Sequence, residues 1–201
     1  MKITKIDQLR ALYNRPSERA VKKQLASLDH HCIHYVSKSP FLVLSTVDTK
    51  GKIDASPRGG KPGFVQVIDQ QQLIIPDSKG NNRLDSLANI VETGQVGLLF
   101  LIPGVNETLR INGSAYVTTE AELLARFPNE KNPPKTCIVV SVEEAFLHCA
   151  KALMRSKLWA SETQIERTEM PTMGQMLKDQ LGSDKAPETQ EEMVRRYQSD
   201  L

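Results

Sequence analysis

Cationic side chains gather in a short turn that joins an expected strand to an expected helix. The segment runs Pro76-Asp77-Ser78-Lys79-Gly80-Asn81-Asn82-Arg83-Leu84. A helix start exposes unpaired N–H groups and the positive end of the helix dipole, and here it carries two cations and two amides. This combination suits a phosphate group. The alternative is an ordinary capped surface helix with solvated basic residues.

A second segment, Ala55-Ser56-Pro57-Arg58-Gly59-Gly60-Lys61-Pro62-Gly63, is rich in glycine and proline around two cations. Gly59 and its neighbouring glycines would let the backbone approach a flat or anionic ligand closely, and Arg58 could bind phosphate oxygens with its forked guanidinium. The alternative is a flexible hairpin loop without a ligand.

Two polar residues interrupt an expected strand that otherwise faces apolar neighbours. In Leu109-Arg110-Ile111-Asn112-Gly113, Arg110 and Asn112 share one face of the strand. Such a face is either exposed to solvent or directed at a ligand.

The segment Cys149-Ala150-Lys151-Ala152-Leu153-Met154-Arg155-Ser156-Lys157-Leu158-Trp159 contains the single tryptophan. Lys151, Arg155 and Trp159 are four residues apart, so a helix would align them on one side. An indole with two cations could flank an anionic aromatic ring. The alternative is a surface helix whose basic side chains extend into solvent.

The histidines do not form a convincing metal site. His30 and His34 have the spacing of a helical ligand pair, but no cysteine or carboxylate cluster completes a coordination set nearby. Cys149 beside His148 is no evidence of a catalytic dyad, because adjacent residues do not face each other. We therefore expect no metal and identify no catalytic residue.

Charge and composition exclude several classes of function. The 201 residues carry 26 Lys and Arg against 24 Asp and Glu, a net charge of +2, so we expect no nucleic acid or acidic membrane as a partner. Three separated cysteines without a C-x-x-C pair favour a reducing, cytoplasmic compartment. The most apolar stretch, Val96 to Ile102, is far shorter than a membrane span.

Patterning predicts a small antiparallel barrel with helices at both ends of the chain. Strands are expected over residues 41–47, 52–56, 63–68, 72–75, 95–102, 108–118 and 136–142. A helix over 82–93 would be capped by Asn81 or Asn82 and ended by Gly94. About two short helices are expected over 6–36, with Ser17 as a cap. A short helix is expected over 120–127 and a loop over 129–135. Terminal helices are expected from Thr172 onward, with a break at Gly182.

The strand over 95–102 has too much apolar surface for one interior. Val96, Leu98 and Phe100 lie on one face with Ile102, while Leu99 and Leu101 lie on the other. We therefore expect a homodimer with a mostly apolar interface.

The order of these segments resembles the FMN-binding split-barrel proteins of the pyridoxamine 5'-phosphate oxidase family. It is most similar to an uncharacterised branch of FMN-dependent enzymes, in which strings like Ser56-Pro57-Arg58-Gly59, Gly80-Asn81-Asn82-Arg83-Leu84, Leu109-Arg110-Ile111-Asn112-Gly113 and Lys151 to Trp159 recur. The resemblance implies one FMN-binding domain over 1–201, with a helical preface over 1–39, a barrel core over 40–159 and a helical extension over 160–201.

The resemblance also implies roles for individual residues. Arg58 and the turn from Lys79 to Arg83 would hold the FMN phosphate, and Pro76 and Asp77 would pass along the isoalloxazine edge. Arg110 and Asn112 would reach the cofactor from a neighbouring strand. Because the family is similar in being homodimeric with FMN at the interface, the flavin of the partner chain would be approached by Lys151, Arg155, Ser156 and Trp159.

The function implied is an FMN-dependent oxidoreductase that moves a hydride or electrons between FMN and a small substrate. The chain ends Arg195-Arg196-Tyr197-Gln198-Ser199-Asp200-Leu201 where pyridoxamine phosphate oxidases have Arg-Leu-x-Pro, which argues against vitamin B6 as the substrate. The alternatives are a flavin carrier or sensor without turnover, and a split-barrel protein that uses deazaflavin F420 or haem.

Overall fold

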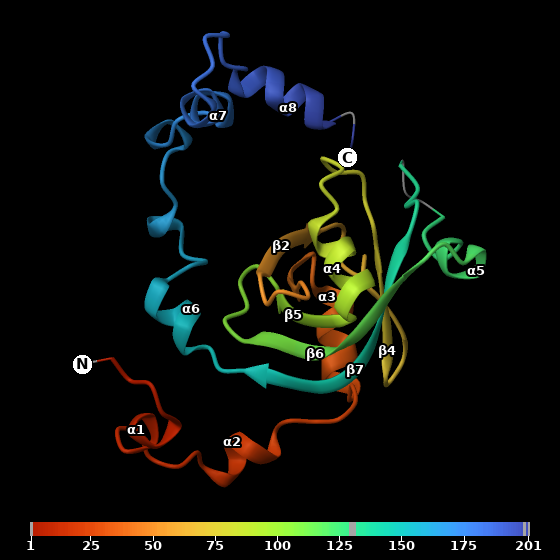
Figure 1. Cartoon of the computed structure of the whole chain (residues 1–201), viewed down its shortest axis with the longest axis vertical. Helices are drawn as coiled ribbons and strands as arrows, with labels where there is room; N and C mark the ends of the chain where they lie inside the picture. Colours follow the sequence, from red (N-terminus) through yellow and green to blue (C-terminus); the bar gives the residue numbers. More distant parts are fainter. Residues whose placement is uncertain (1, 129–131, 199, 201) are drawn as a thin grey trace.

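One antiparallel sheet of seven strands forms the centre of the molecule, in the order β2-β1-β5-β6-β7-β4-β3 (Figure 1). The computed structural model describes residues 2–128, 132–198 and 200. The strands are β1 Phe41–Val47, β2 Ile53–Gly59, β3 Gln66–Asp69, β4 Gln72–Pro76, β5 Gln95–Leu101, β6 Thr108–Thr118 and β7 Cys137–His148. The predicted mainly β fold with flanking helices is confirmed.

Alternation along the central strands separates an inner from an outer face of the sheet. On the inner face Leu42 lies opposite Phe100 and Leu44 opposite Leu98, and all four side chains are fully or almost fully buried. The residues between them, such as Val43 and Leu99, face outward. Burial of the inner rows supplies the apolar core of the barrel.

A bulge between Asn112 and Gly113 bends the two longest strands, β6 and β7. A Cβ atom at position 113 would lie 2.0 Å from the carbonyl oxygen of Ser141, so only glycine fits there. The bend lets the sheet curl.

Two helices pack against the inner side of the sheet. α3 (His30–Lys38) begins at Asp29, whose carboxylate accepts a hydrogen bond from the Cys32 backbone, and it buries Cys32, Tyr35 and Val36. α4 (Asp85–Thr93) buries Ser86 and Ile90 and ends at Gly94, as predicted, with φ of +67°. A third, short helix, α5 (Ala121–Leu124), follows β6.

The N-terminal region contains one helix more than predicted. α1 (Ile6–Arg10) and α2 (Glu18–Lys22) are the two short helices expected, and Ser17 caps α2 as predicted. The histidine segment then forms α3 as a separate capped helix rather than the end of the second one.

The C-terminal region leaves the barrel after β7 and follows an arc that returns to it near α4, where Asp200 contacts Lys79 (Figure 1). It contains α6 (Lys151–Ser156), η1 (Ser161–Thr163), η2 (Arg167–Glu169), α7 (Met173–Leu181) and α8 (Gln190–Gln198), with the predicted break at Gly182. The loop predicted over 129–135 falls partly on residues 129–131, which lie outside the described residues. Among the described helices, none has the length and apolarity that a bilayer span requires.

Candidate functional site

Arg58 and Asp77 lie near each other although their strands, β2 and β4, are far apart in the sheet order. Burial raises the pKa of Asp77 above its ordinary value, and the positive charge of Arg58 partly opposes that rise. A hydrogen bond of 2.6 Å from Ser86, which follows β4 in the chain, to Asp54 of β2 shows that the curled sheet brings β2 toward the end of β4. Two of the predicted site residues are brought together by this closure.

Local hydrogen bonds hold the half-buried Arg58 in place. Its Nη1 atom donates to Ser56 Oγ and, over 3.0 Å, to the carbonyl oxygen of Pro57. Arg58 lies opposite Leu42, so it shares the inner face of the sheet with the core rows. The guanidinium keeps further N–H donors for an anion.

The loop between β4 and α4 is anchored against β2. Ser86 in the first turn of α4 donates a hydrogen bond of 2.6 Å to Asp54 Oδ2 on β2. Asp54 shares the inner face of β2 with Arg58. Sequence reasoning missed both Asp54 and Ser86. The alternation of Asp54, Ser56 and Arg58 along one strand could have placed Asp54 on the same face as Arg58.

The start of α4 has no side-chain cap, and the prediction that Asn81 or Asn82 caps it is wrong. Asn81 Oδ1 accepts a hydrogen bond from the Arg83 backbone N–H at 3.1 Å, and the helix begins three residues later than predicted, at Asp85. Asn82 and Leu84 both have φ of +60°, a conformation that is costly for leucine. First-turn N–H groups without a side-chain acceptor are what an anion site requires.

The two cations of the loop have carboxylate partners. Lys79 Nζ lies 2.5 Å from Asp200 Oδ1, and Arg83 Nε lies 2.7 Å from Asp85 Oδ2. The exposed Arg83 lowers the pKa of Asp85 by this contact. These are exposed pairs, which are easily exchanged for another anion.

A buried hydroxyl without a partner lies beside Asp77. The Asp77 N–H donates to the carbonyl oxygen of Thr136 over 3.0 Å, next to the buried Pro76. Thr136 Oγ1 is buried and has no hydrogen-bond partner among the described residues. Nothing in the local sequence indicated this unpartnered hydroxyl.

The glycines of residues 59–63 have structural explanations. A Cβ atom at Gly60 would lie 2.7 Å from Phe64 Cβ, and Gly63 has φ of +83°. Gly59 is the last residue of β2, and a Cβ there would make only ordinary contact with the Pro40 carbonyl oxygen, at 3.6 Å. The chain thus needs glycine at positions 60 and 63 for packing and turning, a reason independent of any ligand.

Arg110 and Asn112 lie on the outer face of the sheet, away from Arg58. Arg110 is opposite Leu99 and its guanidinium carbon lies 5.5 Å from the centre of the Phe146 ring. Asn112 Nδ2 donates to Glu144 Oε2 over 2.9 Å. Within one chain these two residues do not join the Arg58 cluster.

The expected alignment of Lys151, Arg155 and Trp159 on one helix is wrong. α6 ends at Ser156, because Lys157 adopts a left-handed conformation with φ of +50°. Trp159 therefore lies beyond the helix, and its Nε1 donates to the Val105 carbonyl oxygen at 2.9 Å. Lys151, Arg155 and Ser156 remain together on α6 and are exposed.

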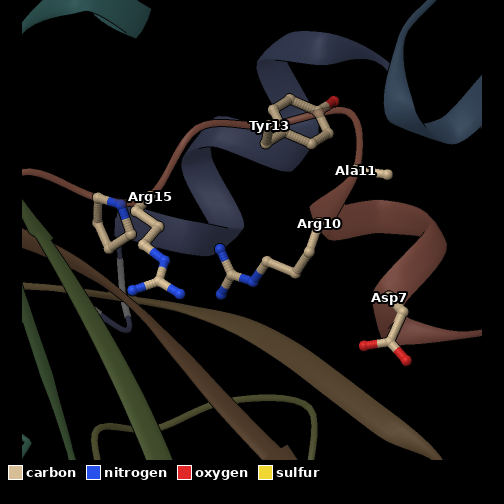
Figure 2. A pocket seen from close by; sticks show the side chains of 6 residues that line it. Asp7, Arg10, Ala11, Tyr13 and Arg15 are labelled. Atoms are coloured by element: carbon tan, nitrogen blue, oxygen red, sulfur yellow. The ribbon is translucent and has the colours of Figure 1, made fainter.

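Two hollows of the surface lie outside the Arg58 cluster. One, of about 530 Å³, lies between Trp159 and the loop at Gly104. The other, of about 630 Å³, is on the N-terminal segment, where the Arg10 and Arg15 guanidinium groups point toward the same space below Tyr13 (Figure 2). Within the described residues, no three His, Cys, Asp or Glu side chains come together as a metal site.

The fold and this cluster define a split β-barrel with a cationic site where β2 meets the β4–α4 loop. The chain belongs to the pyridoxamine 5'-phosphate oxidase family, since the family model of that description matches residues 28–149. The matched region runs from the start of α3 to the end of β7 and leaves both ends of the chain outside it.

Solved structures support the fold. HupZ from Group A Streptococcus aligns with a TM-score of 0.51 at 18% identity, over 60% of this chain and 93% of that one. A candidate pyridoxamine 5'-phosphate oxidase from Lactobacillus delbrueckii aligns with a TM-score of 0.50 at 19% identity, over 62% of this chain and 98% of that one. No match to this chain was found among curated proteins.

Proposed function

We propose that this protein is an FMN-dependent oxidoreductase that acts on a small molecule. The observation that carries the proposal is the contact between β2 and α4: Ser86 donates to Asp54, which shares the face of β2 with Arg58, and the first turn of α4 has no side-chain cap. Membership of the pyridoxamine 5'-phosphate oxidase family supports a flavin as the ligand. FMN fits better than FAD because the basic turn from Lys79 to Arg83 suits one terminal phosphate and the sequence has no dinucleotide-binding fingerprint.

The residues present fit FMN. Arg58, Lys79 and Arg83 hold the phosphate together with the N–H groups at the start of α4, and Asn81 and Asn82 shape that turn. Pro76 and Asp77 line the ring edge, where the unpartnered Thr136 hydroxyl offers a hydrogen bond. Bound FMN supplies hydride or electron transfer, and the protein binds, orients and shields it.

A second subunit supplies the residues that one chain leaves apart. Arg110 and Asn112 lie on the opposite face from Arg58, and the Lys151 to Trp159 segment lies beyond the end of β7. In a homodimer these groups reach the flavin of the partner, where a cation stabilises the reduced, anionic ring. The chain is a single domain in a cytoplasmic compartment, where the three free cysteines stay reduced.

The spectrum of the freshly purified protein tests this function. We expect a yellow protein that releases a compound with the mass of FMN and whose flavin is bleached by NAD(P)H and restored by an added acceptor. A colourless protein that quenches no added FMN would refute the proposal. An absorption spectrum typical of F420 or haem would show that the protein uses that cofactor in place of FMN. A yellow protein whose flavin spectrum no electron donor or acceptor changes would be a flavin carrier.

A further inference from the structure

Two cationic side chains from distant segments converge on one aromatic ring on the outer face of β7. Lys23 Nζ lies 5.3 Å from the centre of the Phe146 ring, and the guanidinium carbon of Arg110 lies 5.5 Å from it. Both distances fall within the range in which a cation interacts with an aromatic ring. The His148 ring, whose centre lies 6.3 Å from that of Phe146, adds a third nitrogen-bearing side chain. We call these residues the Phe146 cluster.

The segment that carries Lys23, residues 23–25, is fixed to the edge of β7. The pairing of β4 with β7 ends at Ser141, so the second half of β7 has an open edge on that side. Leu25 fills this edge, because its N–H donates to the Ala145 carbonyl oxygen and its carbonyl oxygen accepts from the Ala145 N–H, both at 2.9 Å. Lys23 Nζ donates to the Leu147 carbonyl oxygen at 2.9 Å. Lys23 therefore has a defined position although its side chain is exposed.

A carboxylate on the same face of β7 is bound by amides and not by the two cations. Glu144 Oε1 accepts a hydrogen bond of 2.6 Å from Gln24 Nε2, and its Oε2 accepts one of 2.9 Å from Asn112 Nδ2. Within the described residues, neither Lys23 nor Arg110 forms an ion pair with a carboxylate. Two cations that share one ring therefore lack a counter-anion in this part of the chain.

Cations gathered in this way favour an anionic ligand. Lys23 and Arg110 carry the same charge, so an anion bound between them would offset their mutual repulsion. The Arg110 guanidinium makes no hydrogen bond to the described part of the chain, which leaves its N–H groups as donors, and Lys23 uses only one of its own. A carboxylate or a phosphate group supplies the matching oxygen acceptors, and such charge-assisted hydrogen bonds are strong.

We propose that the Phe146 cluster binds the oxyanion of an acidic substrate, a carboxylate or a phosphate group. The inference rests on the proposed function, in which Arg110 reaches the flavin of the partner subunit, and it adds the class of substrate that is held beside that flavin. The half-buried Phe146 ring offers an apolar surface to the carbon skeleton next to the anion. Lys23 lies outside the region matched by the family, residues 28–149, so the N-terminal segment adds this cation to the fold.

Fluorine NMR measures anion binding at the cluster directly. A fluorinated phenylalanine at position 146 of the full chain gives a ¹⁹F signal beside the two cations. At constant ionic strength, titration with sodium acetate or sodium phosphate should shift this signal until it saturates. A response to acetate alone would identify a carboxylate as the ligand, and a response to phosphate alone would identify a phosphate group. A signal that neither anion shifts would overturn the inference.

Substitution of Lys23 tests its part in the cluster without altering the backbone pairing of Leu25. In Lys23→Gln the affinity for the anion should fall about 5- to 10-fold, between the worth of an exposed ion pair and that of a hydrogen bond to a charged group. Lys23→Arg keeps the charge and should restore most of the affinity. Lys22→Gln is the matched control, because Lys22 is the neighbouring exposed lysine and pairs with Glu18. Equal affinities in Lys23→Gln and Lys22→Gln would refute the assignment.

The anion site and the flavin function fail in different ways. FMN and riboflavin titrated into the same variants report flavin binding separately from the ¹⁹F signal. If the flavin's own phosphate occupied the cluster, Lys23→Gln would weaken the binding of FMN and not that of riboflavin, which would overturn the assignment to a substrate. A protein that binds FMN while the signal at position 146 ignores both anions refutes the anion site alone. A protein whose signal responds but which takes up no FMN refutes the flavin function alone.

Discussion

Removal of the Arg58 guanidinium is the perturbation that most directly tests the phosphate site. Arg58 is half-buried, and its Nη1 donates to Ser56 and Pro57. Its other N–H groups are free to bind an oxyanion, and a hydrogen bond to a charged group is worth about 1.5–3 kcal/mol. Arg58→Gln should therefore weaken FMN binding by about 10- to 150-fold.

The assay is quenching of flavin fluorescence in titrations with FMN and riboflavin. Riboflavin lacks the phosphate, so its affinity should change far less. Arg58→Lys should lie between the parent and Arg58→Gln, because a lysine keeps the charge and loses the forked geometry. Arg19→Ala, which removes an exposed arginine from α2, is the control that should leave both affinities unchanged.

Equal losses for FMN and riboflavin would show that Arg58 does not contact the phosphate. A second readout comes from Asp77, whose raised pKa is held down in part by Arg58. In Arg58→Gln the pKa of Asp77 should rise further, which a carboxyl-selective NMR titration would detect. An unchanged titration would refute the closure of the barrel at this point.

Three further predictions follow from buried or capping groups. A thiol reagent should modify Cys149 alone in the native protein and all three cysteines after unfolding, because burial raises the pKa of Cys32 to about 11 and also raises that of Cys137. Asp29→Ala should lower the unfolding free energy by about 1 kcal/mol, because it removes the cap of α3. The backbone hydrogen bond lowers the pKa of Asp29 from 3.8, so this stabilisation is present above pH 3.8 and is lost as the pH falls through the lowered pKa. Asp77→Asn should raise the thermal stability of the ligand-free protein at neutral pH, because a carboxyl whose pKa is raised by folding destabilises the ionised native state, and the gain should vanish below the ordinary pKa of 3.8.

Strands next to clear turn signals were predictable to the residue. β1 and β6 have the predicted bounds: β1 lies between Pro40 and the turn at 48–51, and β6 follows the turn at 103–106. β2 is longer than predicted, since Pro57 and Gly59 suggested a loop. β2 is an edge strand, and there a proline need not donate to a neighbouring strand.

Details of the site depended on backbone conformations that residue types do not reveal. Asparagine is a favourable cap, yet the left-handed conformations of Asn82 and Leu84 move the helix start to Asp85. Four-residue spacing aligned Trp159 with α6 only on the assumption that the helix continued, and Lys157 ends it. The approach of Arg58 to Asp77 arises from closure of the barrel, which no local pattern encodes.

The two faces of the sheet determine how the proposed site must be assembled. Arg58 lies in the inner cross-strand row with Leu42 and Phe100, whereas Arg110 lies in the outer row with Leu99. Side chains alternate strictly along a strand, so only a bulge could move Arg110 to the inner face. The bulge of β6 lies after Asn112, and Arg110 keeps its outward position. If one flavin contacts both arginines, they must therefore come from different chains, and a dimer is then a requirement of the chemistry as well as of the exposed apolar face.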